Sequence, residues 1–215
     1  NEDLVVGGRY HNGNTAITEF YGGTALRMGG AESPTGWVLK GKSRHVAFDD
    51  LGNGFILPRN VQDPAEGRFV FSKFPNMEEY GGRRGNLLHH PNYYAILYLG
   101  EGNGFWKSND MGVTFDLLYT FPDKVRYIQM SYSHPDVIYA DVVNQGLYRS
   151  GDGGVTWVRK PALTSTANAG TYWNGKLFFD VSPYNPDHLY AVLQNGTWST
   201  DLGRVYRSSD GGTTW

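Results

Sequence analysis

The sequence predicts an all-β fold assembled from a repeated unit. Glycine is abundant, with 29 copies in 215 residues, and aromatic residues make up 15% of the chain, led by 15 tyrosines. Glycine suits tight turns, whereas tyrosine, phenylalanine and tryptophan favour strands. One short pattern occurs three times in the second half, and no segment shows convincing helical periodicity. Together these observations predict short strands, joined by turns and organised by a repeat.

The repeated pattern is Ser-x-Asp-x-Gly-x-Thr-aromatic, at Ser108–Phe115, Ser150–Trp157 and Ser208–Trp215. Its aspartate can accept hydrogen bonds from backbone N–H groups ahead of it, which closes an Asx-type turn. Its glycine can take a positive φ, its threonine restarts an extended segment, and its aromatic ring buries the turn. The residues assigned to this structural role are Ser108, Asp110, Gly112, Thr114, Phe115, Ser150, Asp152, Gly154, Thr156, Trp157, Ser208, Asp210, Gly212, Thr214 and Trp215.

This pattern resembles the Asp-box, or BNR repeat, of sialidases, sortilin-like receptors, xyloglucan-degrading glycosidases and a photosystem assembly factor. All defined positions match, except that Phe115 stands in place of Trp. The resemblance covers residues 86–215 well and residues 1–85 loosely. It implies a β-propeller with four-stranded antiparallel blades, in which the box joins the third and fourth strands and lies away from the active site. It therefore bears on fold far more than on function.

The first 30 residues are expected to form a partial blade without a box. Leu4–Arg9 is an apolar strand that runs into glycine, and Thr15–Tyr21 alternates as a second strand. His11–Asn14 between them is a hairpin turn signal. Because of that hairpin, we expect Leu4–Arg9 to be a middle strand of its blade.

Residues 31–85 are expected to form one divergent blade with long connections. Val46–Phe48 and Gly54–Leu57 are predicted to pair as a hairpin around a turn at Asp49–Asn53. Arg68–Ser72 is a further strand. Pro34–Gly36 is predicted to be a loop.

From residue 86 the repeat extends beyond the box. Each unit also carries a [His/Asn]-Pro-[Asp/Asn] turn, after which the second strand of the blade begins. The boxes begin at residues 108, 150 and 208, which is 42 and then 58 residues apart. The first spacing fits the roughly 40–50 residues of a four-stranded blade, and the second includes insertions at Thr164–Tyr172 and Gln194–Leu202. The expected blades are 86–121, 122–163 and 164–215, the last without its fourth strand.

The best-defined blade is the one between the first and second boxes. Its four strands are predicted at Arg126–Tyr132, Val137–Val143, Gly146–Ser150 and Thr156–Lys160. The count of about four to five blades, incomplete at both ends, predicts a segment of a larger propeller, because an open fan exposes strand edges and blade faces. We expect residues 1–215 alone to be insoluble or self-associating, unless further blades or a partner protein cover these edges.

Composition excludes several classes of function. The net charge of −2 provides no basic field for nucleic acid, and no apolar run approaches the roughly 20 residues of a membrane span. The absence of cysteine excludes disulfides and thiolate chemistry. No cofactor is expected. Since the chain begins at Asn1, it is expected to be processed or truncated.

Some carboxylates are candidates for a catalytic role. A glycosidase needs two carboxyl groups about 5–9.5 Å apart, and Asp49 and Asp50 are the candidates for a catalytic acid of a xyloglucanase-like propeller. The alternative, a solvated hairpin turn, is favoured. The box aspartates fall on three blades and so cannot form one centre. The Phe-Arg-Ile-Pro segment of sialidases is absent, since Leu57–Arg59 does not match it.

Histidines and aromatic residues are the remaining candidates. His11, His45, His89 and His90 could bind a metal, but turn roles explain them better, and no metal site is predicted. Exposed aromatic residues could stack on sugar rings or anchor a protein partner. Besides Tyr93, Tyr94, Trp106 and Tyr172, this group includes Trp173 and Trp198, which lie in the inserted loops and are the candidate binding residues.

Three functions remain open. The sequence favours a secreted or cell-surface bacterial propeller that serves as a binding or scaffold module, with a protein or carbohydrate partner. The second hypothesis is a xyloglucan-type glycoside hydrolase whose catalytic residues lie partly outside this segment. The third is an intracellular assembly factor, and a periplasmic location is a further alternative. Fold alone cannot decide between them.

Overall fold

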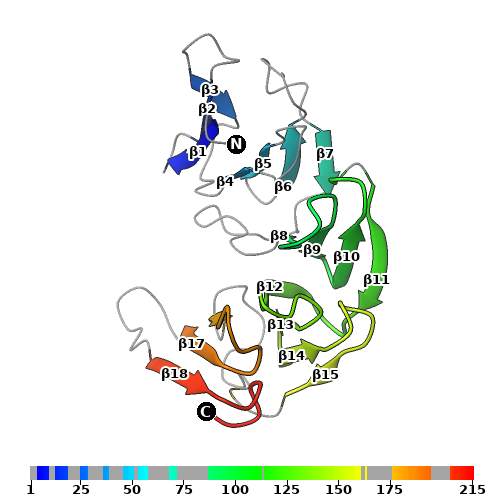
Figure 1. Cartoon of the computed structure of the whole chain (residues 1–215), viewed down its shortest axis with the longest axis vertical. Helices are drawn as coiled ribbons and strands as arrows, with labels where there is room; N and C mark the ends of the chain where they lie inside the picture. Colours follow the sequence, from blue (N-terminus) through cyan, green and yellow to red (C-terminus); the bar gives the residue numbers. More distant parts are fainter. Residues whose placement is uncertain are drawn as a thin grey trace. The chain divides into compact units, whose positions relative to one another are not determined.

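The structure is a computed structural model. It describes residues 4–9, 13–18, 25–28, 36–38, 46–50, 53–57, 68–71, 87–112, 114–160, 163, 176–194 and 204–215. Within these ranges every regular element is a β-strand, and the strands form five antiparallel sheets (Figure 1). The chain divides into two compact units, one of residues 1–84, 94–96 and 109–114 and one of residues 85–93, 97–108 and 115–215. The all-β class predicted from the sequence is confirmed.

The first unit holds two sheets. One has the order β1–β2–β3 and the other has the order β4–β5–β6–β7. Their strands are β1 (Leu4–Arg9), β2 (Gly13–Thr18), β3 (Ala25–Met28), β4 (Gly36–Val38), β5 (Val46–Asp50), β6 (Asn53–Leu57) and β7 (Arg68–Phe71). In both sheets each strand pairs with its neighbour along the chain.

Two expectations for this unit are corrected. Asp49 and Asp50 do not form a turn, because they belong to β5 and pair with Gly54 and Asn53 of β6. Pairing between β5 and β6 overrides the turn preference of Asp and Asn. Residue 36 begins a strand, although a loop was predicted there.

The second unit holds three sheets of the same design. Their orders are β8–β9–β10–β11, β12–β13–β14–β15 and β16–β17–β18. The strands are β8 (Leu87–His89), β9 (Leu97–Glu101), β10 (Gly104–Ser108), β11 (Asp116–Thr120), β12 (Val125–Met130), β13 (Ile138–Val142), β14 (Gly146–Ser150), β15 (Val158–Arg159), β16 (Lys176–Val181), β17 (Leu189–Gln194) and β18 (Arg204–Ser208).

The blade predicted between the first two boxes is observed with small changes. Gly146–Ser150 is found as predicted, and the second box does join a third strand, β14, to a fourth, β15. Strand β15 is shorter than predicted because it pairs with β14 only through Arg159 and Val158. The structure therefore confirms the place of this box within a four-stranded sheet.

The core of the second unit lies between successive sheets. Tyr139 and Leu147 on one face of the β12–β15 sheet are fully buried against Leu177, Phe179 and Leu189 of the β16–β18 sheet. This two-sided packing explains why these strands are apolar on both faces. These sheets therefore pack face to face in chain order, and the turns described below connect their strands.

Candidate functional site

The second box is a closed turn organised by one carboxylate. Asp152 Oδ1 accepts hydrogen bonds from the Ser150 hydroxyl (2.8 Å) and from the backbone N–H groups of Val155 (3.1 Å) and Thr156 (2.9 Å). Its Oδ2 accepts the Thr156 hydroxyl at 2.6 Å. Asp210 makes the same four bonds with Ser208, Thr213 and Thr214 in the third box.

These bonds determine what the two carboxylates can do. Donation from the Thr156 hydroxyl and backbone lowers the pKa of Asp152 to about 2, and Thr214 lowers the pKa of Asp210 to about 2 in the same way. A general acid in a glycosidase needs a raised pKa, so that it holds a proton near neutral pH. The box carboxylates are therefore hydrogen-bond acceptors of the fold and unsuited to acid catalysis.

Two consecutive residues of each box take the left-handed conformation. In the second box these are Gly153 (φ 73°) and Gly154 (φ 92°), and in the first they are Met111 (φ 62°) and Gly112 (φ 83°). Sequence reasoning expected a positive φ at the second position only. The first of the two residues also adopts a positive φ. Its N–H donates a hydrogen bond to a carbonyl in the turn between the first and second strands of the same sheet, as from Gly153 to Asp136 (2.9 Å).

The box also presses against the neighbouring sheet. A Cβ on Gly154 would clash with the ring of Phe105 in β10. The indole of Trp157 donates to the Gly154 carbonyl at 2.9 Å and meets Phe105 and Phe121 edge to face, both with ring centroids 5.0 Å apart. The box thus fastens its own sheet to the one before it.

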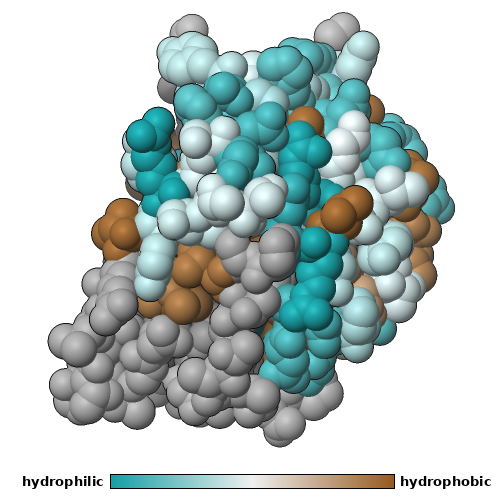
Figure 2. Space-filling view, turned by 90° about the horizontal axis from the view of Figure 1, so that it is seen from below, coloured by the Kyte–Doolittle hydropathy of each residue, from teal (hydrophilic) through white to brown (hydrophobic). Residues whose placement is uncertain are grey.

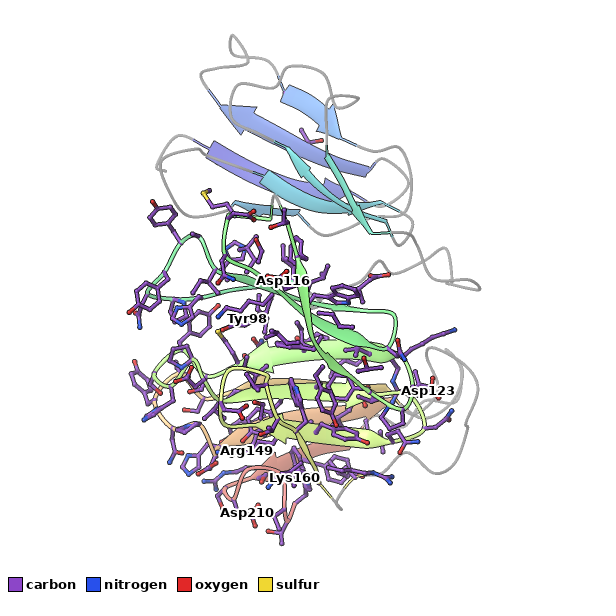
Figure 3. All side chains as sticks on the ribbon, turned by 90° about the vertical axis from the view of Figure 1, so that its right-hand side faces the viewer. Tyr98, Asp116, Asp123, Arg149, Lys160 and Asp210 are labelled. Carbon is purple, nitrogen blue, oxygen red and sulfur yellow. The ribbon has the colours of Figure 1, made fainter. Side chains whose placement is uncertain are left out.

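A second contact between sheets is polar. Tyr139 of β13 donates its hydroxyl to the Pro186 carbonyl at 2.8 Å and accepts from Arg149 Nε at 3.1 Å. Arg149 also binds Asp187 Oδ1 at 3.0 Å. Burial is the main reason why the pKa of Tyr139 is raised to about 12, so its hydroxyl remains a donor. Figure 3 shows Tyr98, Arg149 and Asp210 toward one edge of the sheets and Asp123 at the opposite edge.

A buried ion pair lies within the β12–β15 sheet, and its carboxylate reaches the next sheet. Arg126 and Asp141 are almost fully buried, with their nearest atoms, Arg126 Nε and Asp141 Oδ2, 2.8 Å apart. Asp141 Oδ2 also accepts the backbone N–H of Leu177 in the next sheet at 3.1 Å. A charge buried in this way is tolerated only when it is paired and hydrogen-bonded. The Asp141 carboxylate therefore connects the two sheets.

Only some of the predicted site residues fall in the part of the chain that the structure describes. Asp49 and Asp50 lie in β5, and Trp173, Trp198, His11 and His45 lie outside the described residues. Asp152 and Asp210 close turns on different sheets, as expected for structural boxes. No cluster of three His, Cys, Asp or Glu residues able to hold a metal occurs in the described part.

His90 and His134 have turn roles, as predicted, whereas His89 lies in strand β8. His90 Nδ1 accepts the backbone N–H groups of Asn92 (3.1 Å) and Tyr93 (3.3 Å), and burial lowers the pKa of His90. His134 shares a hydrogen bond of 2.9 Å with the Ser133 hydroxyl. A ring nitrogen that accepts two N–H groups is deprotonated, so His90 is neutral and fixed in its turn.

Exposed tyrosines lie in the turns between the first and second strands of the three sheets. Tyr93 and Tyr94 are 63% and 53% exposed, as considered from the sequence. Tyr132 (53%) and Tyr184 (88%) were missed, although both stand a few residues before the proline of the repeated turn. Rings of this kind can stack on sugars or anchor a partner. Trp106 is different, because it is partly buried and its indole donates to the Glu101 carbonyl (3.2 Å).

The chain is similar in sequence to xyloglucanases. The chain is 28% identical, over 58% of its length, to xyloglucanase Xgh74A of Acetivibrio thermocellus. It is 29% identical, over 56% of its length, to a xyloglucanase of Hypocrea jecorina. It spans 24% and 17% of these two relatives, and no family model matches it.

Solved structures support the fold. The crystal structure of an ancestral GH74 enzyme superposes on 95% of the chain with a TM-score of 0.63 at 15% identity, and the chain covers 28% of that structure. The chain is thus part of a β-propeller, and the propeller predicted from the boxes is confirmed. In the part of the chain that the structure describes, no helix is long and apolar enough to cross a membrane.

Proposed function

We propose that the chain is part of a secreted β-propeller glycoside hydrolase that acts on a xyloglucan-type polysaccharide. The observation that carries this proposal is the similarity, at 28–29% identity over more than half of the chain, to two xyloglucanases. The likeness to a GH74 enzyme structure supports the same fold. This proposal replaces the scaffold module that the sequence favoured.

The proposed chemistry needs an acid and a second carboxylate across a cleft. The second and third boxes are unsuited to supply the acid, because hydrogen bonds lower the pKa of Asp152 and Asp210 to about 2. We assign the acid to Asp49 or Asp50 at the end of β5. Consecutive strand positions lie on opposite faces of a sheet, so we expect only one of the two to face the cleft as the acid, with its partner in another part of the propeller.

The test measures xyloglucan hydrolysis by the natural polypeptide that contains these residues. We expect release of reducing ends, and a fall in kcat of about 10²–10⁴ in either Asp49→Asn or Asp50→Asn, as for loss of a general acid. Asp152→Asn is the control and should keep kcat at temperatures well below its unfolding. Absence of hydrolysis by the folded wild-type protein would reject the enzyme, and unchanged kcat in both variants would reject the assigned acid.

A binding module is the second candidate. The exposed tyrosines of the turns, Tyr93, Tyr132 and Tyr184, support it, since exposed rings can stack on sugars. The inserted loops add Trp173 and Trp198 as proposed contacts. The expected result is retention on immobilised xyloglucan without turnover, weakened by replacing both tryptophans with alanine. Equal retention by that double variant would remove the two tryptophans from the binding surface.

A further inference from the structure

The β16–β18 sheet has one covered face and one exposed face. On the covered face Leu189 is fully buried and Ala191 is 3% exposed, and both pack against the β12–β15 sheet. On the other face Tyr190, Val192 and Val205 are 57%, 39% and 74% exposed. Figure 2, seen from the side on which β18 lies in Figure 1, shows apolar residues at the surface there.

The register of the strands shows which residues are equivalent in the three sheets. A tyrosine of the second strand pairs directly with a cation of the third strand in every case. The pairs are Tyr98 with Lys107, Tyr139 with Arg149 and Tyr190 with Arg207. Two positions before each cation, on the same face, stand Phe105, Leu147 and Val205.

This face is covered in the first two sheets. Tyr98 is 2% exposed, and Phe105, Tyr139 and Leu147 are fully buried. Tyr190 and Val205 therefore do not differ from their equivalents in chemical type or register. They differ because a following sheet covers the earlier two faces.

The cover of the β12–β15 sheet includes two turns of the next sheet in addition to the strand residues named above. From the proline turn, the Pro186 carbonyl accepts the Tyr139 hydroxyl, and Asp187 binds Arg149 at 3.0 Å. From the box, Gly212 lies so near Leu147 that a Cβ would stand 2.6 Å from its Cδ2. Tyrosine, cation and apolar residue thus each have a specific counterpart.

The β8–β11 sheet is covered by the same two turns of its successor. A Cβ on Gly153 would lie 3.7 Å from the Tyr98 hydroxyl and 3.5 Å from Asp136 Oδ1, and Gly154 packs on Phe105. Burial first, and then the charge of Asp136, raises the pKa of Tyr98. The Lys107 ammonium lies 5.8 Å from the centre of the Tyr98 ring. The arrangement is therefore repeated and not particular to one pair of sheets.

We propose that the exposed face of β17 and β18 binds a further Asp-box blade of the same polypeptide. The proline carbonyl of that blade accepts the Tyr190 hydroxyl, the acidic residue after the proline binds Arg207, and the box glycine packs on Val205. Both observed interfaces join consecutive parts of one chain, and the chain spans 24% of the Acetivibrio relative. These two facts favour a blade in cis over a second copy.

The first test uses the natural polypeptide, carrying single cysteines read by mass spectrometry of the labelled peptide. Residues 1–215 contain no cysteine, so Val205→Cys, Val155→Cys as the exposed control and Leu147→Cys as the buried control are distinct sites. We expect Cys at 205 to react at least about tenfold more slowly than Cys at 155 at every protein concentration. Reaction as fast as at 155 would show a bare face, and protection lost on dilution would show a second copy; either overturns the proposal.

The second test identifies the acidic partner. Arg207→Lys is treated with a carbodiimide, which joins a lysine to a touching carboxylate, and Arg149→Lys serves as the matched control. Arg149 lies 3.0 Å from Asp187, so the control should form that cross-link. We expect the residue-207 variant to link to an acid that follows a proline in another blade. No link, or a link to an acid in any other setting, would overturn the proposal, provided that the control links.

Discussion

The β12–β15 and β16–β18 sheets carry nearly the same local sequence but differ in exposure. Their boxes are closed by the same bonds at the same lengths, 2.8, 3.1, 2.9 and 2.6 Å. Yet Tyr139 is fully buried, whereas its equivalent Tyr190 is 57% exposed. The box is thus a property of its own few residues, while burial of the sheet face is a property of the neighbour.

The largest expected effect comes from breaking the contact between a box and the preceding sheet. Gly154→Ala places a methyl group against the Phe105 ring at a backbone φ of 92°. Strain of the backbone and overpacking together should lower the free energy of unfolding by about 4 kcal/mol. The control is Gly151→Ala, whose Cβ would meet only Arg149, at 3.6 Å. Chemical denaturation of both variants measures the difference, and equal stabilities would contradict the contact.

The next effect compares the equivalent apolar positions. Leu147→Ala removes a fully buried side chain and should cost about 3 kcal/mol through lost burial and the cavity left behind. Val205 is 74% exposed in the structure, so Val205→Ala should cost no more than about 0.5 kcal/mol if nothing covers it. In the natural polypeptide, a cost above about 1 kcal/mol for Val205→Ala would show that a neighbour buries it.

The polar part of the interface is tested by removing one hydroxyl. Tyr139→Phe leaves the Pro186 carbonyl without its 2.8 Å donor and should cost about 1–2 kcal/mol. Tyr190→Phe in the natural polypeptide should cost about as much, if a further blade supplies the acceptor. A cost for Tyr139→Phe alone would show that the two tyrosines are equivalent in register but not in function.

The smallest effect is a pH dependence shared by both sheets. Because the pKa values of Asp152 and Asp210 are lowered to about 2 in the folded protein, their contribution is present above the unfolded pKa and is lost as pH falls toward 2. Stability should therefore decline between about pH 4 and pH 2. Urea unfolding at several pH values should show a shallower decline in Asp152→Asn than in wild type.

Predictions from the sequence were correct where the structure depends on residues that lie close together in the chain. The strand Gly146–Ser150 was predicted correctly, because it lies between a glycine turn and a box. The turn predicted at Asp49 and Asp50 was wrong, since pairing with β6 overrides the turn preference of those residues. The positive φ of Met111 could not be predicted, because methionine disfavours that conformation and a hydrogen bond to Ala95 (2.9 Å) imposes it.

The candidate site was less predictable, because it depends on contacts between distant parts of the chain. Tyr98, Tyr139 and Tyr190 occupy equivalent positions, and nothing in the sequence around Tyr190 indicates its exposure. The roles of Asp49, Asp50, Trp173 and Trp198 depend on which distant parts of a propeller face them. Such information lies in the tertiary arrangement, whereas the bonding partners of Asp152 lie within seven residues of chain, from Ser150 to Thr156.

The central claim is that the box carboxylates stabilise the fold and take no part in chemistry. The most direct measurement is the melting temperature of Asp152→Ala in the natural polypeptide, together with its turnover or binding of xyloglucan well below that temperature. The N–H groups of Val155 and Thr156 are exposed and can bind water instead, so we expect a loss near the lower end of about 1–3 kcal/mol, with unchanged activity. An unchanged melting temperature with lost activity would contradict the claim.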